Sequence, residues 1–196
     1  MLVRPFPRSS SLAIFFTKED GFFVHSYHFQ YTKHQLSYKQ NMNLYLHEFI
    51  KDTFKKPANA LDLGAGDFFD VACMKQLGWK CEGVDLNTGT NLEKPFLSKH
   101  GPFRLVYSNY VFHKIKNKKT FLQTVYNNLM HDGWFFIHTF DASDPNSSSD
   151  ISKRDLEKSL KDAGFTNIQV TTFSFFDNEA GHRHWHKILE AVGRKG

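Results

Sequence analysis

The chain contains 196 residues, of which 40% are hydrophobic and 16% aromatic, and its formal net charge is +5. This length predicts one domain with a full core and a short appendage. The basic excess is compatible with an anionic substrate or with RNA, but the chain lacks the Lys and Arg blocks of a dedicated nucleic-acid-binding protein. No apolar run approaches the ~18 residues of a membrane span, and no signal-peptide cleavage site follows residues 11–16. Cys73 and Cys81 suggest neither a disulfide framework nor a metal site, so we expect a cytoplasmic protein that makes no membrane contact.

Residues 1–56 precede the first clear strand and are expected to form an N-terminal segment. Residues 1–35 mix aromatic and polar side chains without a clear period, and Phe22–Val24 and Tyr27–Phe29 could form a short strand pair or a flap. From Leu36 to Phe54 apolar residues recur at helical spacing, which predicts an amphipathic helix that ends before Pro57.

A glycine turn follows the first predicted strand, Ala58–Leu63, and opens a helix over Phe69–Leu77. Gly64 and Gly66 allow a tight turn and a close approach of the backbone to a ligand. Asp67 is expected to cap the helix, with Asp70 three residues later as an acidic capping box. The second strand, Cys81–Leu86, contains Asp85, which lies 19 residues after Gly66. This interval is close to that of an acid that accepts a ribose hydroxyl.

The remaining elements alternate between strand and helix. Only 17 residues, 87–103, lie between the second strand and the next clear strand, which is too few for two crossovers. The usual third strand and one helix are therefore predicted to be missing or reduced to a stub around Thr90–Leu92. The alternation predicts an α/β fold, a doubly wound, mainly parallel sheet with an antiparallel C-terminal hairpin joined by the polar stretch Asp177–Gly181. The later predicted elements are the strands Phe103–Ser108, Trp134–Thr139, Phe165–Phe176 and Arg183–Val192, and the helices Lys118–Met130 and Ser152–Ala163.

The charges at the glycine turn favour a cationic nucleoside over a dinucleotide. A pyrophosphate would lie at the helix N-terminus, where Asp62 and Asp67 would repel it. S-adenosylmethionine, with its ammonium, sulfonium and ribose, suits both acids. This argument opposes the alternative of a nicotinamide-dependent oxidoreductase.

With these residues the chain resembles the class I (Rossmann-like) S-adenosylmethionine-dependent methyltransferases. Asp62, Gly64, Gly66 and Asp85 match the family motif, whereas Phe68 stands at the third glycine. The resemblance makes residues 57–196 the Rossmann-like methyltransferase domain and residues 1–56 an N-terminal segment with a lid-like helix. It implies Tyr27, His28, Tyr31 and Tyr38 as candidate lid residues. The cofactor-binding residues that it implies are Asp62, Gly64, Ala65, Gly66, Asp67, Asp85, Leu86, Asn91, Ser108 and Asn109.

Two assignments in this set follow from the family's usual arrangement. Leu86 is expected to pack on the adenine, and Asn91 or Glu93 to replace the acid that reads the adenine amino group. The stretch Leu105–His113 resembles the fourth strand and the loop that lines the methionine arm of the cofactor. This loop lacks the Asn/Asp-Pro-Pro-aromatic motif of adenine and glutamine N-methyltransferases, and neither cysteine is placed for the chemistry of C5-methyltransferases.

The expected reaction is in-line transfer of the methyl group to an unidentified small-molecule acceptor, with no metal. A hydroxyl acceptor needs a base, for which His113 and His138 are the candidates, whereas an anionic acceptor would instead gain from Lys114 or Arg183. The alternative is a module that binds S-adenosylmethionine or RNA without small-molecule turnover. Nothing in the sequence determines the oligomeric state.

The histidines at the C-terminus allow a further reading. His182, His184 and His186 share one face of the last strand, and two of them could join His138 around a metal ion, although imidazoles on a partly wet face are favoured. The stretch Gly181–Glu190 is loosely similar to the end of tellurite-resistance-type methyltransferases, which does not identify a substrate.

Overall fold

A computed structural model describes residues 42–179 and 182–196, all within the compact unit Tyr38–Gly196. The predicted flap and lid residues and the first part of the predicted N-terminal helix lie outside the described residues. The predicted start of that helix at Leu36 is wrong, because α1, Leu44–Thr53, begins after its N-cap Asn43, whose side chain accepts from the Leu46 N–H. α1 belongs to the same compact unit as the sheet. The predicted division at residue 56 stays a prediction.

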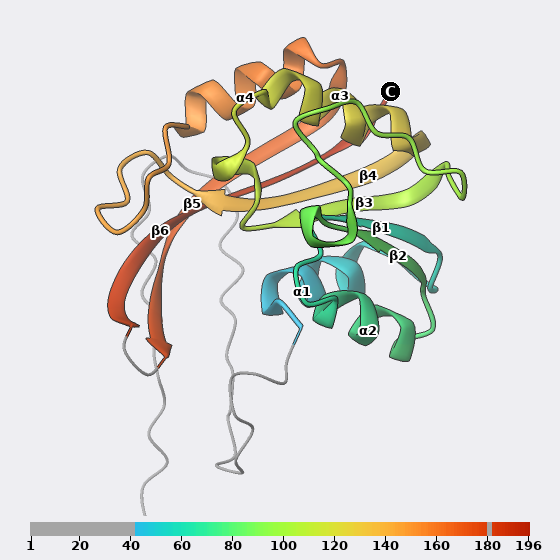
Figure 1. Ribbon diagram of the computed structural model, residues 1–196, viewed down its shortest axis with the longest axis horizontal. Helices are drawn as coiled ribbons and strands as arrows, with labels where there is room; N and C mark the ends of the chain where they lie inside the picture. The colour runs from blue at the N-terminus through green and yellow to red at the C-terminus, as the bar shows by residue number, and fades with distance from the viewer. Residues whose placement is uncertain (1–41, 180–181) are drawn as a thin grey trace, which may run out of the picture. The chain divides into compact units, whose positions relative to one another are not determined.

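The centre of the fold is a sheet of six strands in the order β2-β1-β3-β4-β6-β5 (Figure 1). β1, β2, β3 and β4 pair in parallel, and β6 runs antiparallel to both β4 and β5. This confirms the predicted mainly parallel sheet with an antiparallel C-terminal hairpin. The strands are β1 (Asn59–Leu63), β2 (Lys80–Val84), β3 (Phe103–Asn109), β4 (Leu129–Phe140), β5 (Phe165–Glu179) and β6 (His182–Lys195).

The truncation after the second strand is also confirmed. Between β2 and β3 the chain forms only the short 3₁₀ turn η2, Leu86–Thr88, and otherwise loops back, so β2 is an edge strand. This loop is fixed by its own side chains. Leu92 is buried in the core, and the Glu93 carboxylate accepts hydrogen bonds from the backbone N–H groups of Lys116 and Asn117.

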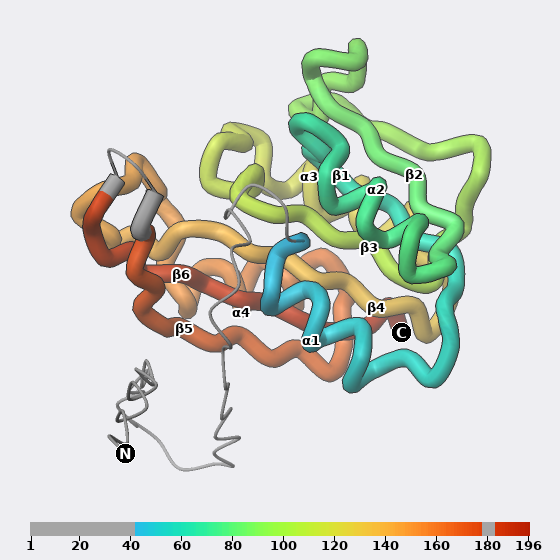
Figure 2. Tube along the Cα trace, turned by 90° about the horizontal axis from the view of Figure 1, so that it is seen from below, coloured from blue at the N-terminus to red at the C-terminus, as the bar shows by residue number. Residues whose placement is uncertain are grey.

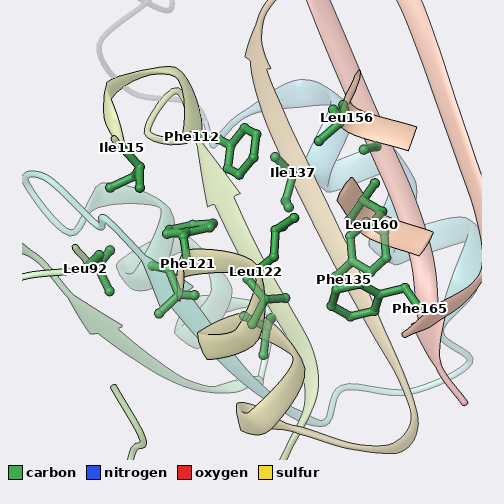
Figure 3. Packing of buried hydrophobic residues seen from close by; sticks show 14 of the residues in the cluster. Leu92, Phe112, Ile115, Phe121, Leu122, Phe135, Ile137, Leu156, Leu160 and Phe165 are labelled. Carbon is green, nitrogen blue, oxygen red and sulfur yellow. The ribbon is translucent and has the colours of Figure 1, made fainter. Parts of the chain in front are cut away.

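Helices cover both faces of the sheet. In Figure 1, α3 (Lys118–Asn128) and α4 (Lys153–Asp162) lie above it, and α1 and α2 (Phe69–Gln76) lie below it, on the side that faces the viewer in Figure 2. Because strand side chains alternate between faces, each helix pair closes its own apolar cluster. Figure 3 shows the cluster beneath α3 and α4, where Leu160 and Phe165 pack near Phe135, and Phe121 packs near Phe112.

The structure corrects two predicted boundaries. β4 begins at Leu129 and not at Trp134, because the polar residues before Trp134 form an irregularity in the strand, with Asp132 in the left-handed region at φ 60°. The hairpin extends further than predicted, because Asp177 pairs with His184 as part of the ladder and not of the turn. Within the described residues, no helix is long and apolar enough to cross a membrane.

Candidate active site

The glycine turn connects β1 to α2 at the carboxyl edge of the sheet. Gly64 and Gly66 both have positive φ, +89° and +54°. A Cβ on Gly64 would lie 2.3 Å from Cγ2 of Val111, in the loop after β3, whereas a Cβ on Gly66 would meet nothing within 4 Å. The N–H groups of Gly64 and Ala65 donate to the Val84 carbonyl and hold the turn against β2. Gly64 therefore serves packing, and Gly66 borders open space.

The predicted capping box is wrong. The N-cap of α2 is Phe68, at φ 63°, and it makes no side-chain capping hydrogen bond. Asp67, one residue before the N-cap, accepts a hydrogen bond from the N–H of Phe69, the first residue of the helix. Phe68 adopts the left-handed conformation at the place of the third motif glycine. The close approach of α2 to β2 comes instead from Gly83, where a Cβ would lie 2.7 Å from Val71 and 2.8 Å from Ala65. Our sequence analysis missed Gly83.

Asp85 follows β2 and contacts the turn directly. Its Oδ2 accepts a hydrogen bond of 3.0 Å from the Gly66 N–H, and its Oδ1 accepts one of 2.9 Å from the Asn87 N–H. A carboxylate offers about four lone-pair sites, so both oxygens can still accept from a ligand hydroxyl. Leu86 beside it is 70% exposed, which is unusual for a leucine.

The two candidates for reading the adenine differ in their contacts. Oδ1 of Asn91 accepts a hydrogen bond from the Glu93 N–H, which leaves the amide nitrogen of Asn91 for other partners. Both oxygens of Glu93 bind the N–H groups of Lys116 and Asn117, and these bonds lower the pKa of Glu93. Glu93 thus has a structural role in the loop, and Asn91 is the better placed of the two.

Asp62 lies beneath the turn rather than beside it. Its side chain is on the α1 and α2 face of the sheet, only 3% of the residue is exposed, and Oδ1 has no hydrogen-bond partner. Burial and then the Asp70 carboxylate raise its pKa well above the usual value, although a hydrogen bond with Tyr107 opposes the shift. A buried acid without a full set of partners costs stability.

Ser108 and Asn109, at the end of β3, tie neighbouring elements together. The Ser108 hydroxyl donates a 2.7 Å hydrogen bond to the Leu63 carbonyl of β1. The Asn109 amide donates one of 2.7 Å to Asp70, which also accepts from the Asn43 backbone just before α1. Oδ1 of Asn109 is buried without a partner. These contacts place both residues beside the turn.

The two candidate bases stand on either side of an aromatic pair. The rings of Tyr110 and Phe140 lie 5.3 Å apart; Tyr110 contacts His138, and Phe140 contacts His113. Nδ1 of His113 lies 3.3 Å from the Thr139 hydroxyl, and burial, with Lys114 adding to it, lowers the His113 pKa to about 4. His113 is therefore neutral at physiological pH.

His138 is fully buried on β4. Its Nδ1 lies 3.4 Å from the Asn43 amide nitrogen, and its Nε2 lies 3.3 Å from Oε2 of Glu190. The second distance is that of an ion pair, but the geometry is not that of a hydrogen bond, so Nε2 is a buried polar atom without a partner. His138 can act on a bound molecule only through a neighbour.

Comparison with known proteins identifies the family. A family model described as "Methyltransferase domain" matches residues 32–188, most of the chain. The chain belongs to this methyltransferase family. No curated protein matches the sequence.

Three solved structures share the fold of this methyltransferase domain at low identity. One is phosphoethanolamine N-methyltransferase 2 of Haemonchus contortus, in complex with phosphomonomethylethanolamine and S-adenosylhomocysteine, with a TM-score of 0.60 at 14% identity. The match covers 76% of our chain and 52% of that chain, so our chain spans about half the length of that protein. The 1,6-didemethyltoxoflavin-N1-methyltransferase of Burkholderia thailandensis gives 0.58 at 20%, covering 76% of each chain. A SAM-dependent methyltransferase of Methanosarcina mazei gives 0.63 at 11%, covering 75% of ours and 96% of its own.

Among the described residues, His184 and His186 do not form a metal site with His138. Nε2 of His184 lies 2.9 Å from Nε2 of His186, and Nδ1 of His186 lies 2.7 Å from the buried Asp144 carboxylate. His182 has no described side chain. In residues 42–179 and 182–196, no group of three His, Cys, Asp or Glu side chains could hold a metal ion.

A cavity of about 520 Å³ lies at the opposite edge of the sheet. It is lined where β1, β2 and β3 begin, by residues that include Asn59, Lys80 and Phe103. None of the predicted site residues lines it, so it is separate from the candidate active site.

Proposed function

We propose that this protein transfers a methyl group from S-adenosylmethionine to a small-molecule acceptor by in-line displacement. The observation that carries the proposal is the contact between Asp85 and Gly66 at a turn whose outer side is open. An acid with spare acceptor capacity beside bare backbone suits a ribose, and the Asp67 carboxylate at the same turn opposes a pyrophosphate. The family match over residues 32–188 supports the same chemistry.

The residues at this edge fit S-adenosylmethionine, which supplies an already activated methyl group. Asp85 would accept from the ribose hydroxyls, and the exposed Leu86 would cover the adenine, with Asn91 near its amino group. Gly66 leaves the backbone open to the ligand, Gly64 and Ala65 hold the turn against β2, and Asp67 would add negative charge near the sulfonium. Asp62 lies beneath the turn, and the hydrogen bonds of Ser108 and Asn109 tie the end of β3 to its neighbours. The protein's main task is then to align the acceptor and exclude water.

The two histidines fit different parts of this task. With its pKa near 4, His113 is a poor proton acceptor at neutral pH, so we assign it a hydrogen-bonding role toward the acceptor. His138 is enclosed and would act by orienting Glu190, 3.3 Å away. We therefore propose His113 as a residue that contacts the acceptor and His138 as a residue that positions Glu190.

The neighbours support a small acceptor. The Haemonchus enzyme holds phosphomonomethylethanolamine and the Burkholderia enzyme 1,6-didemethyltoxoflavin, together with S-adenosylhomocysteine. No observation favours the alternative of a module that binds RNA or binds the cofactor without turnover. The cytoplasmic location stays a prediction.

Calorimetry with the full chain tests this proposal. We expect S-adenosylmethionine to bind and NAD to give no heat, and Asp85→Ala to weaken binding at least about tenfold, because a hydrogen bond to a charged group contributes about 1.5–3 kcal/mol. Asp162→Ala, which removes an exposed carboxylate on α4, is the matched control and should bind normally. Binding of NAD, or equal affinity in the Asp85 variant, would refute the proposed site. Labelled methyl transfer into a metabolite extract then tests turnover.

A further inference from the structure

The two faces of the β5–β6 hairpin differ in charge. Phe173 contacts Tyr45 of α1, with ring centroids 4.6 Å apart, so the residues that alternate with it share the α1 face. On this face the paired positions are Thr171 with Glu190, Phe173 with Ile188, Phe175 with His186 and Asp177 with His184. None of these eight positions holds Lys or Arg. The opposite face carries Arg183 and Lys187.

Aromatic rings from four elements meet above Glu190 on that face. Tyr45 of α1 lies 5.0 Å from His138 of β4, and Tyr110, in the loop after β3, lies 5.6 Å from the same imidazole. Phe173 of β5 completes the group at 5.5 Å from His138. Tyr45 and Tyr110 are each half-buried, whereas Phe173 and His138 are buried.

Carboxylates surround these rings. Burial and then Glu190 raise the pKa of Tyr45 to about 12. Burial also raises the pKa of Tyr110, and the Asp177, Asp70 and Glu190 carboxylates all add to the shift. The side chain of Glu190 is 28% exposed, although it lies on an interior strand of the sheet. A chain of net charge +5 therefore has a locally acidic surface here.

One nitrogen in this group faces Glu190 without a formed hydrogen bond. Nε2 of His138 is buried, and Oε2 of Glu190 lies 3.3 Å away but misaligned. Nδ1 of His138 faces the amide nitrogen of Asn43, which only donates, so Nε2 carries the proton and can donate to a realigned Glu190 carboxylate.

This surface adjoins the glycine turn. Val111 packs against Gly64, and Tyr110 precedes Val111 in the chain. Asp70 joins the two regions, since it binds Asn109 and contributes to the field at Tyr110. A molecule on the rings would therefore lie next to the proposed cofactor site.

We infer that the acceptor is an organic amine, bound as its cation on an amine surface made by Tyr45, Tyr110, Phe173, Asp177 and Glu190. Aromatic faces and carboxylates together favour an ammonium group over a neutral or anionic one. The inference rests on the proposed methyltransferase function and names the substrate class of that same site.

Methyl transfer to an amine requires a free lone pair on its nitrogen. The ammonium gives one proton to the Glu190 carboxylate, which frees the nitrogen lone pair. That pair forms the new C–N bond while the C–S bond breaks and its electrons stay on sulfur. The products are the methylated ammonium and S-adenosylhomocysteine, and the exposed Glu190 returns its proton to solvent. His138 is the positioning residue, because its Nε2, 3.3 Å from Oε2, would donate to Glu190 once the carboxylate turns toward it.

The test compares three probes of similar shape on the full chain saturated with S-adenosylhomocysteine. These are 2-phenylethylamine, the neutral 2-phenylethanol and the anion phenylacetate, joined by a panel of aliphatic amines and amino alcohols. We expect at least one amine to bind at millimolar concentration or better, and the alcohol and acid to bind about tenfold more weakly or not at all. With S-adenosylmethionine, the methyl label should appear on nitrogen.

Variants separate this inference from the cofactor site. Glu190→Gln should weaken amine binding about tenfold and leave S-adenosylmethionine affinity unchanged, Asp177→Asn should weaken it less, and Asp162→Asn should have no effect. Equal binding of the three probes, no binding by any amine in the panel, or unchanged amine affinity in Glu190→Gln would overturn the inference. Failure of S-adenosylmethionine itself to bind would instead reject the proposed function.

Discussion

The two halves of the carboxyl edge are built by different means. At the ends of β1, β2 and β3, the backbone forms the site: Gly64 and Gly66 adopt positive φ, and Asp85 binds a backbone N–H. In the half formed by β4, β6 and β5, side chains from several elements form the proposed amine surface. No backbone conformation there requires a particular residue type. The first kind of site leaves a sequence motif, and the second does not. Changes in the two halves should therefore have different effects.

The largest effect is expected at Gly64. Gly64→Ala combines a positive φ with a Cβ 2.3 Å from Val111, so the free energy of unfolding should fall by about 3 kcal/mol. Gly66→Ala has the φ penalty without the clash and should lose only about 1 kcal/mol. Urea denaturation measures both. If the two variants lose equal stability, the contact with Val111 does not determine the turn.

A second change distinguishes stability from function in the cofactor half. The raised pKa of Asp62 means that its stabilising contribution is present below the unfolded pKa and is lost as pH rises through the folded pKa. Asp62→Asn should therefore increase the free energy of unfolding at pH 7, and the gain should shrink toward pH 4. The same variant should weaken S-adenosylmethionine binding. A variant that is destabilised at pH 7 would show that the acid is structural.

The smallest effect is expected at His113, on the border of the two halves. Its folded pKa of about 4 lies below the ordinary value, so the unfolded chain binds the proton more readily between these limits. Stability should decline as pH falls from about 6.5 toward 4, and this decline should be smaller in His113→Gln. Denaturation midpoints at pH 7 and pH 5 measure it. The control is His131→Gln, an exposed histidine in the β4 irregularity. An unchanged slope in His113→Gln would contradict the burial of the imidazole.

Segment lengths and the alternation of strands and helices were enough to predict the order of the elements and the shortened crossover. The truncated crossover follows from the 17 residues from Asn87 to Phe103, and the helix predicted over Ser152–Ala163 is α4, with Ser152 as its N-cap. The capping box failed because Phe68 adopts a left-handed conformation that residue type alone does not predict. The hairpin turn was misplaced because Asp177 is polar yet pairs within the ladder.

The amine surface could not be predicted, because its members meet only through strand register. Glu190 of β6 pairs across the strands with His138 of β4, and the ring of Tyr45 of α1 lies 5.0 Å from that of His138. Sequence analysis found His138 from its residue type but not Glu190, Tyr45 or Tyr110. The available signal was the alternation of acids and aromatics along β5 and β6, which becomes informative once their pairing is known.

The missing strand beside β2 has a consequence for turnover. Past Thr88 the chain forms a loop, held by Glu93, in place of the third strand and helix that the family resemblance implies. At the proposed cofactor site the adenine would therefore be covered by few side chains, mainly the exposed Leu86. The spent nucleoside should thus depart quickly, and the rate of each cycle should be set by chemistry at the acceptor and not by release of the by-product.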